Sequence, residues 1–459
     1  MKQVSIFLIT VVLIAGLVGC VSTPAQYNLT ISSSAGGSVT TPGEGTFTYD
    51  EGAVVNLVAE AEEGYYFVKW TGDVGTMSDT NTVETTITMN GHYSITANFV
   101  PDGVEPLWDW YDLNSVSDDL SASYLLMNDL DSTTAGYDEL ASPTANEGKG
   151  WQPIGAYEPF APFTGTFNGQ GYGIYDLFIK RPDESVLALF GCTGEQGFIE
   201  NVRLVNASVA GNLSVCTLVG ANFGSLKDCF STGIASGNGI VGGLVGGSDG
   251  IVTNCHSMVE VVSLGGFGGG LVGINIDSGN ISDCYSSGSV SGRFDIGGLV
   301  GSNAGTVGDS YSICNVSGNN TAGGLVGTNV GNVDNCYAMG NVTGIYGMAG
   351  GLVGYNYKGT VSKSYSIGNV TGDINVGGLV GNNNGGTVSN SFWDTETSGQ
   401  ATSAGGTGKT TAEMQDITTL SGATWNIIAV ANPSIRNSSY IWNIVDDVTY
   451  PFLSWEPVS

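Results

Sequence analysis

The stretch "GGLVGTNVGNVDNCYAMGNVTG", Gly323 to Gly344, combines many glycines with few apolar residues. Each glycine inside a helix costs about 1 kcal/mol relative to alanine, so this composition excludes a helix. Its short β-branched runs are separated by Gly and Asn, which is typical of brief strands joined by tight turns. The stretch has too few apolar side chains to form a core alone, so its fold depends on the sequence around it.

The same stretch recurs along the chain. A segment ending in L-V-G repeats every 26 to 28 residues, with its last glycine at Gly220, Gly246, Gly273, Gly301, Gly327, Gly354 and Gly381. Repeats of this kind form one structural unit each and bury their apolar side by stacking. We therefore predict an all-β chain, a parallel β-helix (solenoid) of about ten coils spaced about 4.8 Å apart and preceded by a small antiparallel β module.

An asparagine column follows each L-V-G segment by two residues. Six of its seven members are Asn and the seventh is Ser248; the asparagines are Asn222, Asn275, Asn303, Asn329, Asn356 and Asn383. We expect a ladder of side-chain amides at a corner of the coil, because Asn hydrogen-bonds from layer to layer and tolerates left-handed backbone. The alternative is that these are solvated turn residues.

A Cys/Ser column lies three residues after an aliphatic column. Strict alternation cannot point both columns inward, so either a bend separates them or one column faces out. The cysteines of this column are expected to act as small buried apolar residues; they are Cys229, Cys255, Cys284 and Cys336. Seven cysteines follow Cys20, and an odd number speaks against a disulfide framework. Bridges between stacked neighbours, Cys229–Cys255 or Cys255–Cys284, stay open as the alternative, although stacking gives a poor disulfide dihedral.

An aromatic column comes directly after the Cys/Ser column, with His256 as its single exception. Its tyrosines are Tyr285, Tyr311, Tyr337 and Tyr365. If they face outward, they form a strip suited to sugar rings or to a protein partner, and this strip is the candidate ligand-binding site. The alternative is that the rings pack on one another along the coils.

The chain begins with Lys2, an apolar run from Val4 to Val18, and L-V-G-C ending at Cys20. The run is short for a membrane span and right for a signal peptide. Its ending resembles the bacterial lipoprotein processing motif, which implies cleavage before Cys20 and a lipid on its sulfur. We expect a signal peptide at 1–19, an anchor linker at 20–26, and a lipid-anchored chain at a cell surface or on the outer face of a membrane. An ordinary secretory signal is the alternative.

Residues 27–100 alternate between apolar and polar positions with a period of two, which predicts a small antiparallel β module. The segments "AGGSVT", "GAVVNLVAEAEEGYYFVKWTGD" and "SITANFV" in this region resemble the divergent internalin B-type repeat. That resemblance implies a spacer or adhesive unit of a bacterial surface protein, without catalysis.

The repeat itself, as in "GGLVGYNYKGTVSKSYSIGNVTG" from Gly350, resembles the GLUG motif. Filamentous haemagglutinin-like adhesins and some IgA-specific metallopeptidases share this motif. We divide the region into an acidic lead-in with the first coils at 101–215, the GLUG-repeat β-helix at 216–392 and a C-terminal cap at 393–459. Thr410 and Glu413 predict a capping box that opens one short helix at about 410–420. The expected apolar lid over the last coil consists of Trp425, Trp442, Phe452 and Trp455.

Motifs for catalysis are not convincing in this sequence. "SAGGTGKT", Ser403 to Thr410, lacks the first glycine of a P-loop and is interpreted as a turn. His92 and His256 are the only histidines, so the H-E-x-x-H site of the metallopeptidases is excluded. Arg293 with Asp295 is interpreted as a surface pair. The acids of the repeat are interpreted as polar turns, namely Asp228, Asp283, Asp309 and Asp334. We expect no catalytic, cofactor or metal site, with calcium bound among the acids of 101–131 as the alternative.

Acidic residues outnumber basic ones 42 to 12, which excludes nucleic acid as a partner because there is no basic patch to meet phosphates. The sequence predicts a non-enzymatic adhesin or binding module whose partner is an extracellular polysaccharide or a cell-surface protein, and whose contact with the membrane is its lipid anchor. The rivals are a carbohydrate-active β-helix enzyme, either a lyase or a hydrolase, and a purely structural envelope stalk.

Overall fold

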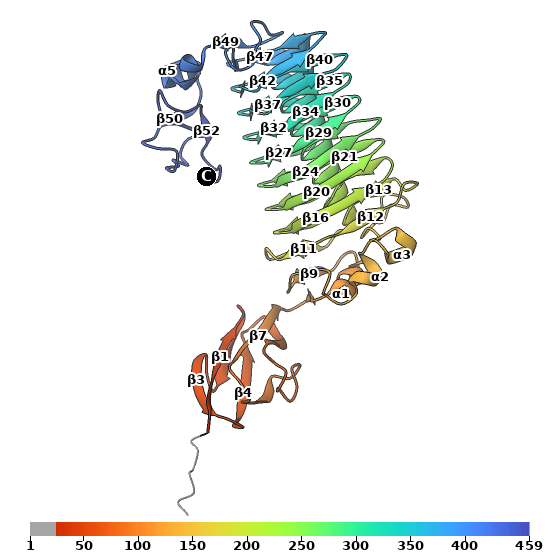
Figure 1. Ribbon diagram of the computed structural model, residues 1–459, viewed down its shortest axis with the longest axis vertical. Coiled ribbons are helices and arrows are strands. Elements are labelled where there is room, and N and C mark those ends of the chain that lie inside the picture. The colour runs from red at the N-terminus through yellow and green to blue at the C-terminus, as the bar shows by residue number, and fades with distance from the viewer. Residues whose placement is uncertain (1–23, 459) are drawn as a thin grey trace, which may run out of the picture. The chain divides into compact units, whose positions relative to one another are not determined.

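The computed structural model describes residues 24–458, and the chain divides after Asp102 into two compact units (Figure 1). The predicted signal peptide and the lipidation residue Cys20 lie outside the described residues. Between residues 24 and 458, no helix has the length and apolar character needed to cross a membrane.

The first unit is a small β module with two sheets. One has the order β3-β1-β7-β5 and the other β2-β4-β6. The period-two pattern places Leu29, Leu57 and Trp70 in its core. Pairing is antiparallel as predicted, except that β1 and β7 are parallel. The strands are β1 (Gln26–Ser33), β2 (Gly37–Thr41), β3 (Gly45–Asp50), β4 (Val54–Ala61), β5 (Tyr65–Gly72), β6 (Glu84–Thr88) and β7 (Tyr93–Pro101).

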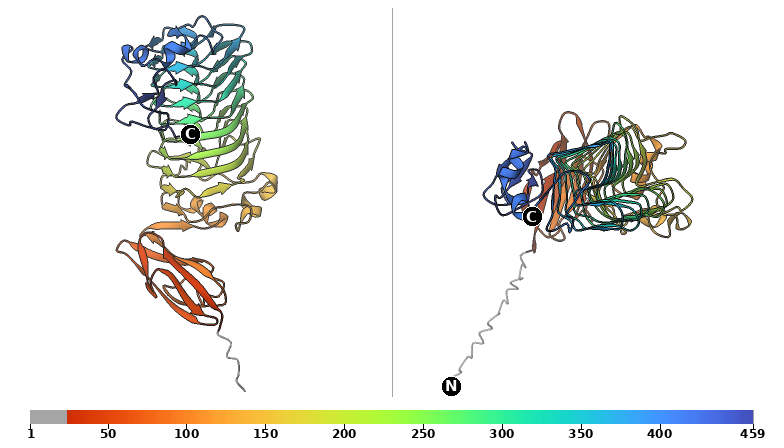
Figure 2. Two further views of the ribbon diagram at one scale, coloured as in Figure 1. Left: turned by 60° about the vertical axis from the view of Figure 1, so that its left-hand side comes forward. Right: turned by 90° about the horizontal axis from the view of Figure 1, so that it is seen from above.

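The second unit is the predicted parallel β-helix, in which each repeat is one coil running through four sheets (Figures 1 and 2). Successive coils pair in register, so that Val326 lies beside Val353 and Val333 beside Val361. One such coil consists of β36 (Val326–Asn329), β37 (Asn332–Asp334), β38 (Tyr337–Ala338), β39 (Val342–Gly344) and β40 (Met348–Gly350).

Eight coils pass through all four sheets, fewer than the ten expected. The two sheets of eight strands run from β13 (Val186–Leu187) to β45 (Val376–Gly377) and from β14 (Phe190–Thr193) to β46 (Val380–Asn384). The lead-in before these coils, residues 103–185, supplies strands to the other two sheets only, beginning with β8 (Val104–Leu107). It also contains three short helices, α1 (Trp110–Ser115), α2 (Tyr137–Leu140) and α3 (Ala145–Gly148).

A sharp bend turns both the aliphatic and the Cys/Ser columns inward. Val252 and Cys255 are both fully buried, and Asn254 between them has a φ of 49°. Every coil has a residue with positive φ at this corner, and we call these residues the corner column: Asn201, Asp228, Asn254, Asp283, Asp309, Asn335, Lys363 and Asn390. Asn and Asp dominate it because their short polar side chains tolerate left-handed backbone.

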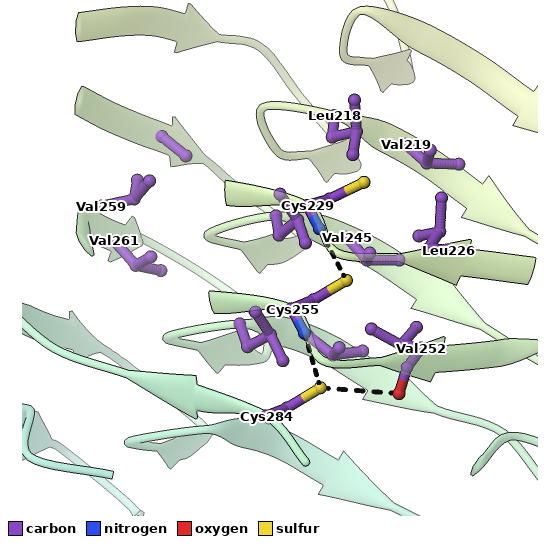
Figure 3. Close-up of a cluster of buried hydrophobic side chains, with 14 of the residues drawn as sticks. Leu218, Val219, Leu226, Cys229, Val245, Val252, Cys255, Val259, Val261 and Cys284 are labelled. Carbon is purple, nitrogen blue, oxygen red and sulfur yellow. Dashed lines mark hydrogen bonds between the residues drawn. The ribbon is translucent and has the colours of Figure 1, made fainter. Parts of the chain in front are cut away.

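The cysteine column lies in the apolar core among valine side chains (Figure 3). The seven described cysteines are free thiols, so the alternative of stacked disulfides is wrong. Instead, the amide of Cys229 donates to Cys255 Sγ at 3.4 Å, and the amide of Cys255 donates to Cys284 Sγ at 3.4 Å.

The asparagines after each L-V-G segment form a buried ladder inside the coils. Asn275 Nδ2 donates to Asn303 Oδ1 at 2.8 Å, and Asn303 Nδ2 donates to Asn329 Oδ1 at 2.8 Å. The ladder continues through Asn356 to Asn383, each step at 3.0 Å. These asparagines do not take left-handed backbone, contrary to expectation; that geometry belongs to the corner column.

The glycine-rich "SAGGTGKT" segment closes the last coil. Ser403 Oγ accepts hydrogen bonds from the amides of Leu379 and Val380, and β49 (Thr407–Lys409) adds to β48 (Phe392–Asp394). The predicted capping box of Thr410 and Glu413 is present. It opens two short helices rather than one, α4 (Thr411–Gln415) and α5 (Ile417–Gly422), because the extended Asp416 ends the first and caps the second. A small sheet follows, with β50 (Ile427–Ala429), β51 (Trp442–Ile444) and β52 (Phe452–Leu453).

Candidate functional site

The aromatic column stands on the outside of the coils and is stacked ring on ring. The ring centroids of Tyr285 and Tyr311 are 5.0 Å apart, those of Tyr311 and Tyr337 are 4.8 Å apart, and the planes differ by only 3° and 4°. His256 continues the stack, 4.7 Å from Tyr285. Each ring therefore uses its faces on its neighbours and presents only its edge to the outside. A sugar needs a free aromatic face, so this column is not a platform for sugar stacking.

The C-terminal segment 424–458, which we call the clasp, covers three of the four predicted strip residues. Tyr311, Tyr337 and Tyr365 are only 8%, 3% and 1% exposed. They form one apolar cluster with the tryptophans of the clasp, which lies along the flank of the coils (Figure 2). The predicted open tyrosine strip is therefore wrong for these three residues. The predicted lid is wrong in its position too, because its tryptophans cover the flank while segment 398–406 contacts the last coil.

The clasp is held by hydrogen bonds as well as by rings. Its three indole N–H groups all bond to the corner column: Trp425 donates to the carbonyl of Asn390 at 2.8 Å, Trp442 to Asn335 Oδ1 at 3.4 Å, and Trp455 to the carbonyl of Asp309 at 2.9 Å. In the other direction, the Tyr365 hydroxyl donates to the carbonyl of Pro451 at 2.6 Å. Burial of these indoles is thus matched by partners for their N–H groups.

Glu456 is the titratable group at the centre of this contact. Its carboxylate accepts hydrogen bonds from the Leu453 amide, at 2.5 Å, and from the Tyr337 hydroxyl. Burial raises its pKa to about 7, and these hydrogen bonds and the nearby Arg436 oppose that shift. The same burial raises the pKa of Tyr337 and Tyr365 well above the ordinary value.

The N-terminal part of the aromatic column is not covered. Phe230, His256 and Tyr285 are half-buried, and the clasp ends beside them. A hollow of about 200 Å³ lies at this point, lined by Asp228, Asn254, His256, Tyr285, Trp455 and Pro457. Burial and the nearby Arg203 lower the pKa of His256, which keeps the imidazole neutral near pH 7.

The 11-stranded sheet that runs from β8 through β37 to β47 (Thr387–Ser389) presents a second regular surface, which we call the polar face. It consists of two columns of outward side chains, and each coil adds one residue to each column. Ser362 Oγ donates to Asp334 Oδ1 at 2.6 Å, so Asp334 belongs here and not to the corner column. The columns contain Ser225, Ile251, Asn280, Thr306, Asn332, Thr360 and Thr387, and Lys227, Thr253, Ser282, Gly308, Asp334, Ser362 and Ser389.

Several of the remaining acids occupy structural positions in the coils and in the lead-in. Asp283 and Asp309 lie in the corner column, where burial raises the pKa of both carboxyls. In the lead-in, Asp109 caps α1, and Asp131 accepts hydrogen bonds from Thr133 and Thr134. Within residues 24–458, no group of three or more His, Cys, Asp or Glu side chains is arranged to hold a metal ion. The Arg293 guanidinium lies 5.2 Å from the centre of the Phe294 ring, while Asp295 accepts from Thr321 and Thr328.

Two family profiles match the chain. Residues 27–103 match the divergent InlB B-repeat domain, and residues 346–371 match the GLUG motif. The chain carries an InlB-type repeat and a GLUG motif. The matched GLUG segment is one coil of the solenoid, from the turn before β40 into β44 (Val370–Gly372), and the InlB B-repeat is the first unit.

Two curated relatives share parts of the sequence. Halomucin of Haloquadratum walsbyi is 34% identical over 155 residues, which is 33% of this chain and 2% of halomucin. A protein of Evansella cellulosilytica, named as a candidate Gly-rich membrane protein, is 38% identical over 84 residues, 18% of this chain and 10% of that protein. The chain thus spans only a small fraction of the length of either relative.

Solved structures of two proteins resemble the chain. One is a candidate immunoglobulin A1 protease from Bacteroides ovatus, with a TM-score of 0.45 and 18% identity over 77% of this chain and 92% of that one. The other is an IgA1 protease, with a TM-score of 0.42 and 16% identity over 74% of this chain and 24% of that one.

Sequence reasoning missed the clasp and the hollow. The repeats predicted which residues stack, but the clasp has no repeat, so its position on the flank left no periodic signal. One signal was available. His256 is the only imidazole in the aromatic column, and it lies where the clasp ends.

Proposed function

We propose that this chain is a non-enzymatic binding protein of a cell surface, an adhesin that holds extracellular polysaccharide. In this proposal the lipidated Cys20 anchors the chain and the InlB-type repeat acts as the spacer between membrane and solenoid. The GLUG motif and the similarity to halomucin and to a membrane protein support a surface location.

The proposed binding of polysaccharide rests on the polar face. Coils that pair in register repeat the same outward positions about every 4.8 Å, which suits a linear polymer with its own repeat. The columns are rich in hydroxyl and amide groups, which both donate and accept hydrogen bonds to sugar hydroxyls. Many weak contacts along one rigid surface add up, because each contact after the first is intramolecular. Asn280, Asn332 and Thr387 of this face are exposed.

The test is a glycan and matrix-protein array probed with the full chain. A triple variant, Thr306→Glu, Asn332→Glu and Thr360→Glu, places three charges on consecutive coils of the polar face. We expect it to lose binding of polysaccharide at least tenfold. The matched control is Asn315→Glu, Asn341→Glu and Asn369→Glu, which adds the same charge to three consecutive coils at exposed asparagines; these lie at or just before the start of a strand of another sheet.

Three outcomes would count against the proposal. Binding that both triple variants lose equally reflects net charge and not the face. Hydrolysis or elimination products from a glycan on the array would favour the carbohydrate-active enzyme. A wild-type chain that retains no glycan and no protein would favour the structural stalk.

A further inference from the structure

The hollow at the end of the clasp differs from the polar face because it is built from three separate elements. Asp228 and Asn254 come from the corner column, His256 and Tyr285 from the aromatic column, and Trp455 with Pro457 from the clasp. Its volume of about 200 Å³ lies below the roughly 300–1,000 Å³ of sites for drug-sized ligands. It therefore has room for one small ring or side chain.

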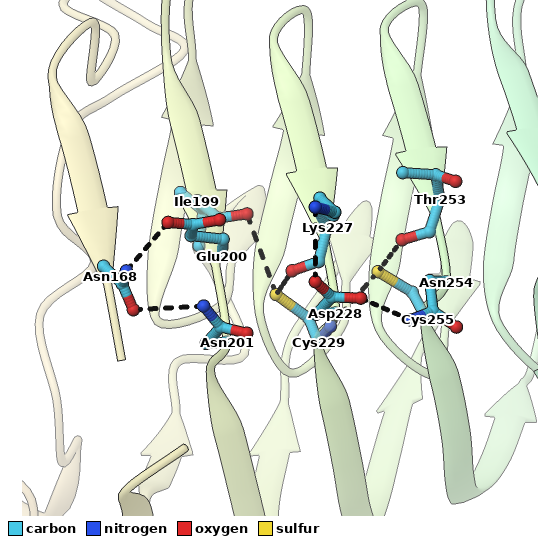
Figure 4. Close-up of polar contacts among 10 residues, drawn as sticks. All are labelled: Asn168, Ile199, Glu200, Asn201, Lys227, Asp228, Cys229, Thr253, Asn254 and Cys255. Atoms are coloured by element: carbon cyan, nitrogen blue, oxygen red, sulfur yellow. Dashed lines mark hydrogen bonds and ion pairs between the residues drawn. The ribbon is translucent and has the colours of Figure 1, made fainter. Parts of the chain in front are cut away.

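The two corner residues supply a fixed polar pair. Asn254 Nδ2 donates to Asp228 Oδ1 on the neighbouring coil, and Lys227 Nζ lies 3.6 Å from Asp228 Oδ2 (Figure 4). The lysine offsets the carboxylate charge, so the site favours neither a cation nor an anion. The amide oxygen of Asn254 and the second lone pairs of the carboxylate remain as acceptors.

His256 adds a group that can both donate and accept. Its ring lies 4.4 Å from Phe230 and 4.7 Å from Tyr285, so its two faces are covered and its nitrogen-bearing edge is what remains. Neither ring nitrogen has a hydrogen-bond partner among residues 24–458. A neutral imidazole has one N–H donor and one acceptor nitrogen. Every other described ring of the column is a Phe or Tyr, so only this coil places ring nitrogens at the flank.

The clasp closes the hollow with an apolar wall. The indole N–H of Trp455 is already bonded to the Asp309 carbonyl, so the ring contributes carbon surface to the hollow and no free donor. An apolar ring surface opposite a set of mixed donors and acceptors matches a sugar, which has C–H patches on its faces and hydroxyls at its edge.

We propose that this hollow binds a single neutral sugar residue, as the end or a side branch of a glycan. This inference rests on the proposed function and names a second, selective subsite for it. Lys227 belongs both to the polar face and to the surroundings of Asp228, so the subsite adjoins that face. A polymer lying on the polar face can therefore place one branch residue at the hollow.

The experiment measures binding of glucose, galactose, N-acetylglucosamine and their β-linked tetrasaccharides to the full chain by saturation-transfer NMR and calorimetry. His256→Phe keeps the stacked ring and removes both nitrogens, and Asp228→Asn keeps the shape and removes the charge. We expect each to weaken binding of one sugar and its tetrasaccharide at least tenfold, with an unchanged melting temperature. Tyr346→Ser, at a ring that is 70% exposed outside the hollow, is the control and should bind as the wild type does.

The outcomes separate this inference from the proposed function. If His256→Phe and Asp228→Asn bind sugars as the wild type does, while the polar-face variant loses polysaccharide, the subsite is overturned and the adhesin proposal stands. If the wild type binds none of these sugars and retains no polysaccharide on the array, both are overturned. If a variant loses binding together with its melting transition, Trp455→Phe decides: its binding must fall while the fold is kept, and unchanged binding overturns the subsite.

Discussion

The asparagine ladder and the tyrosine column arise from the same repeat but have different fates. The ladder lies inside the coils, and its surroundings are other copies of the repeat, from Asn275 through Asn383. The tyrosine column lies outside, and a segment with no repeat decides which of its rings reach solvent. Tyr365 is 1% exposed under the clasp, whereas Tyr285 at its end is half-buried. A repeat therefore determines what stacks, while a unique segment determines what is available for binding.

The largest expected effect comes from a substitution that loosens the clasp over the tyrosine column. Trp442 is fully buried, contacts the rings of Tyr337 and Tyr365, and donates to Asn335. Trp442→Ala leaves a large cavity there, and we expect a loss of about 3–5 kcal/mol in the stability of the clasp. Hydrogen exchange should show faster exchange in 424–458 while the amides of the coils stay protected. Equal loss of protection in clasp and coils would show that the two unfold as one unit. Tyr346→Ser should change stability by less than about 0.5 kcal/mol.

A change of pH sharpens the same contrast, because the clasp holds a desolvated carboxyl at Glu456. Burial raises the pKa of this group to about 7 in the folded chain, from an ordinary value of 4.5. The folded state then binds the proton more tightly than the unfolded state, so stability is greatest below pH 4.5 as far as this group is concerned and falls as the pH rises to about 7. The loss is on the order of 3 kcal/mol, because each pKa unit corresponds to about 1.4 kcal/mol.

Tryptophan fluorescence or hydrogen exchange of the clasp between pH 4.5 and 8 measures this effect. Glu456→Gln should remove the pH dependence, since the neutral amide does not titrate. A clasp whose protection increases between pH 5 and 7 would contradict the assignment to Glu456.

The contrast also explains how much of the molecule could be predicted from its sequence. The coils, their register and the stacked columns follow from spacing alone, because each repeat can bury its apolar side only against another repeat. The bend that turns Val252 and Cys255 both inward was left open, since a spacing of three fits two geometries; the φ of Asn254 settles it. The position of the clasp could not be predicted, because its tryptophan content is equally compatible with a lid over the last coil and with a cover along the flank of the coils. The hollow could not be predicted for the same reason, because Trp455 of the clasp forms one of its walls.

A smaller effect should appear where the ladder itself is interrupted. Ser248 replaces Asn in one coil, and the buried Asn275 Oδ1 on the next coil has no hydrogen-bond partner as a result. In Ser248→Asn, the new side-chain amide N–H would donate to Asn275 Oδ1. The new amide oxygen would replace the Ser248 hydroxyl as the acceptor for Asn222 Nδ2. We expect stabilisation by about 1–2 kcal/mol, because an unsatisfied buried acceptor is removed. Chemical denaturation checks it. Ser248→Leu, which adds volume but no donor, is the control and should destabilise; a gain from both changes would mean that packing, not the ladder, limits this coil.

The smallest effect should come from the column in which the repeat already tolerates two residue types. The Cys255 thiol accepts a hydrogen bond from the Cys229 amide. Serine hydroxyls accept the equivalent hydrogen bond in other coils: the Cys284 amide donates to Ser310 Oγ at 3.1 Å, and the Cys336 amide donates to Ser364 Oγ at 3.0 Å. Cys255→Ser therefore keeps a partner for every polar group, and we expect a change of less than about 1 kcal/mol in the free energy of unfolding. Cys255→Leu instead replaces one sulfur atom by three carbons, which forces extra volume into a close-packed interior and costs about 1–3 kcal/mol. Equal destabilisation by the two variants would mean that the thiol contributes through its apolar packing and that the serine coils are stabilised by something other than this hydrogen bond.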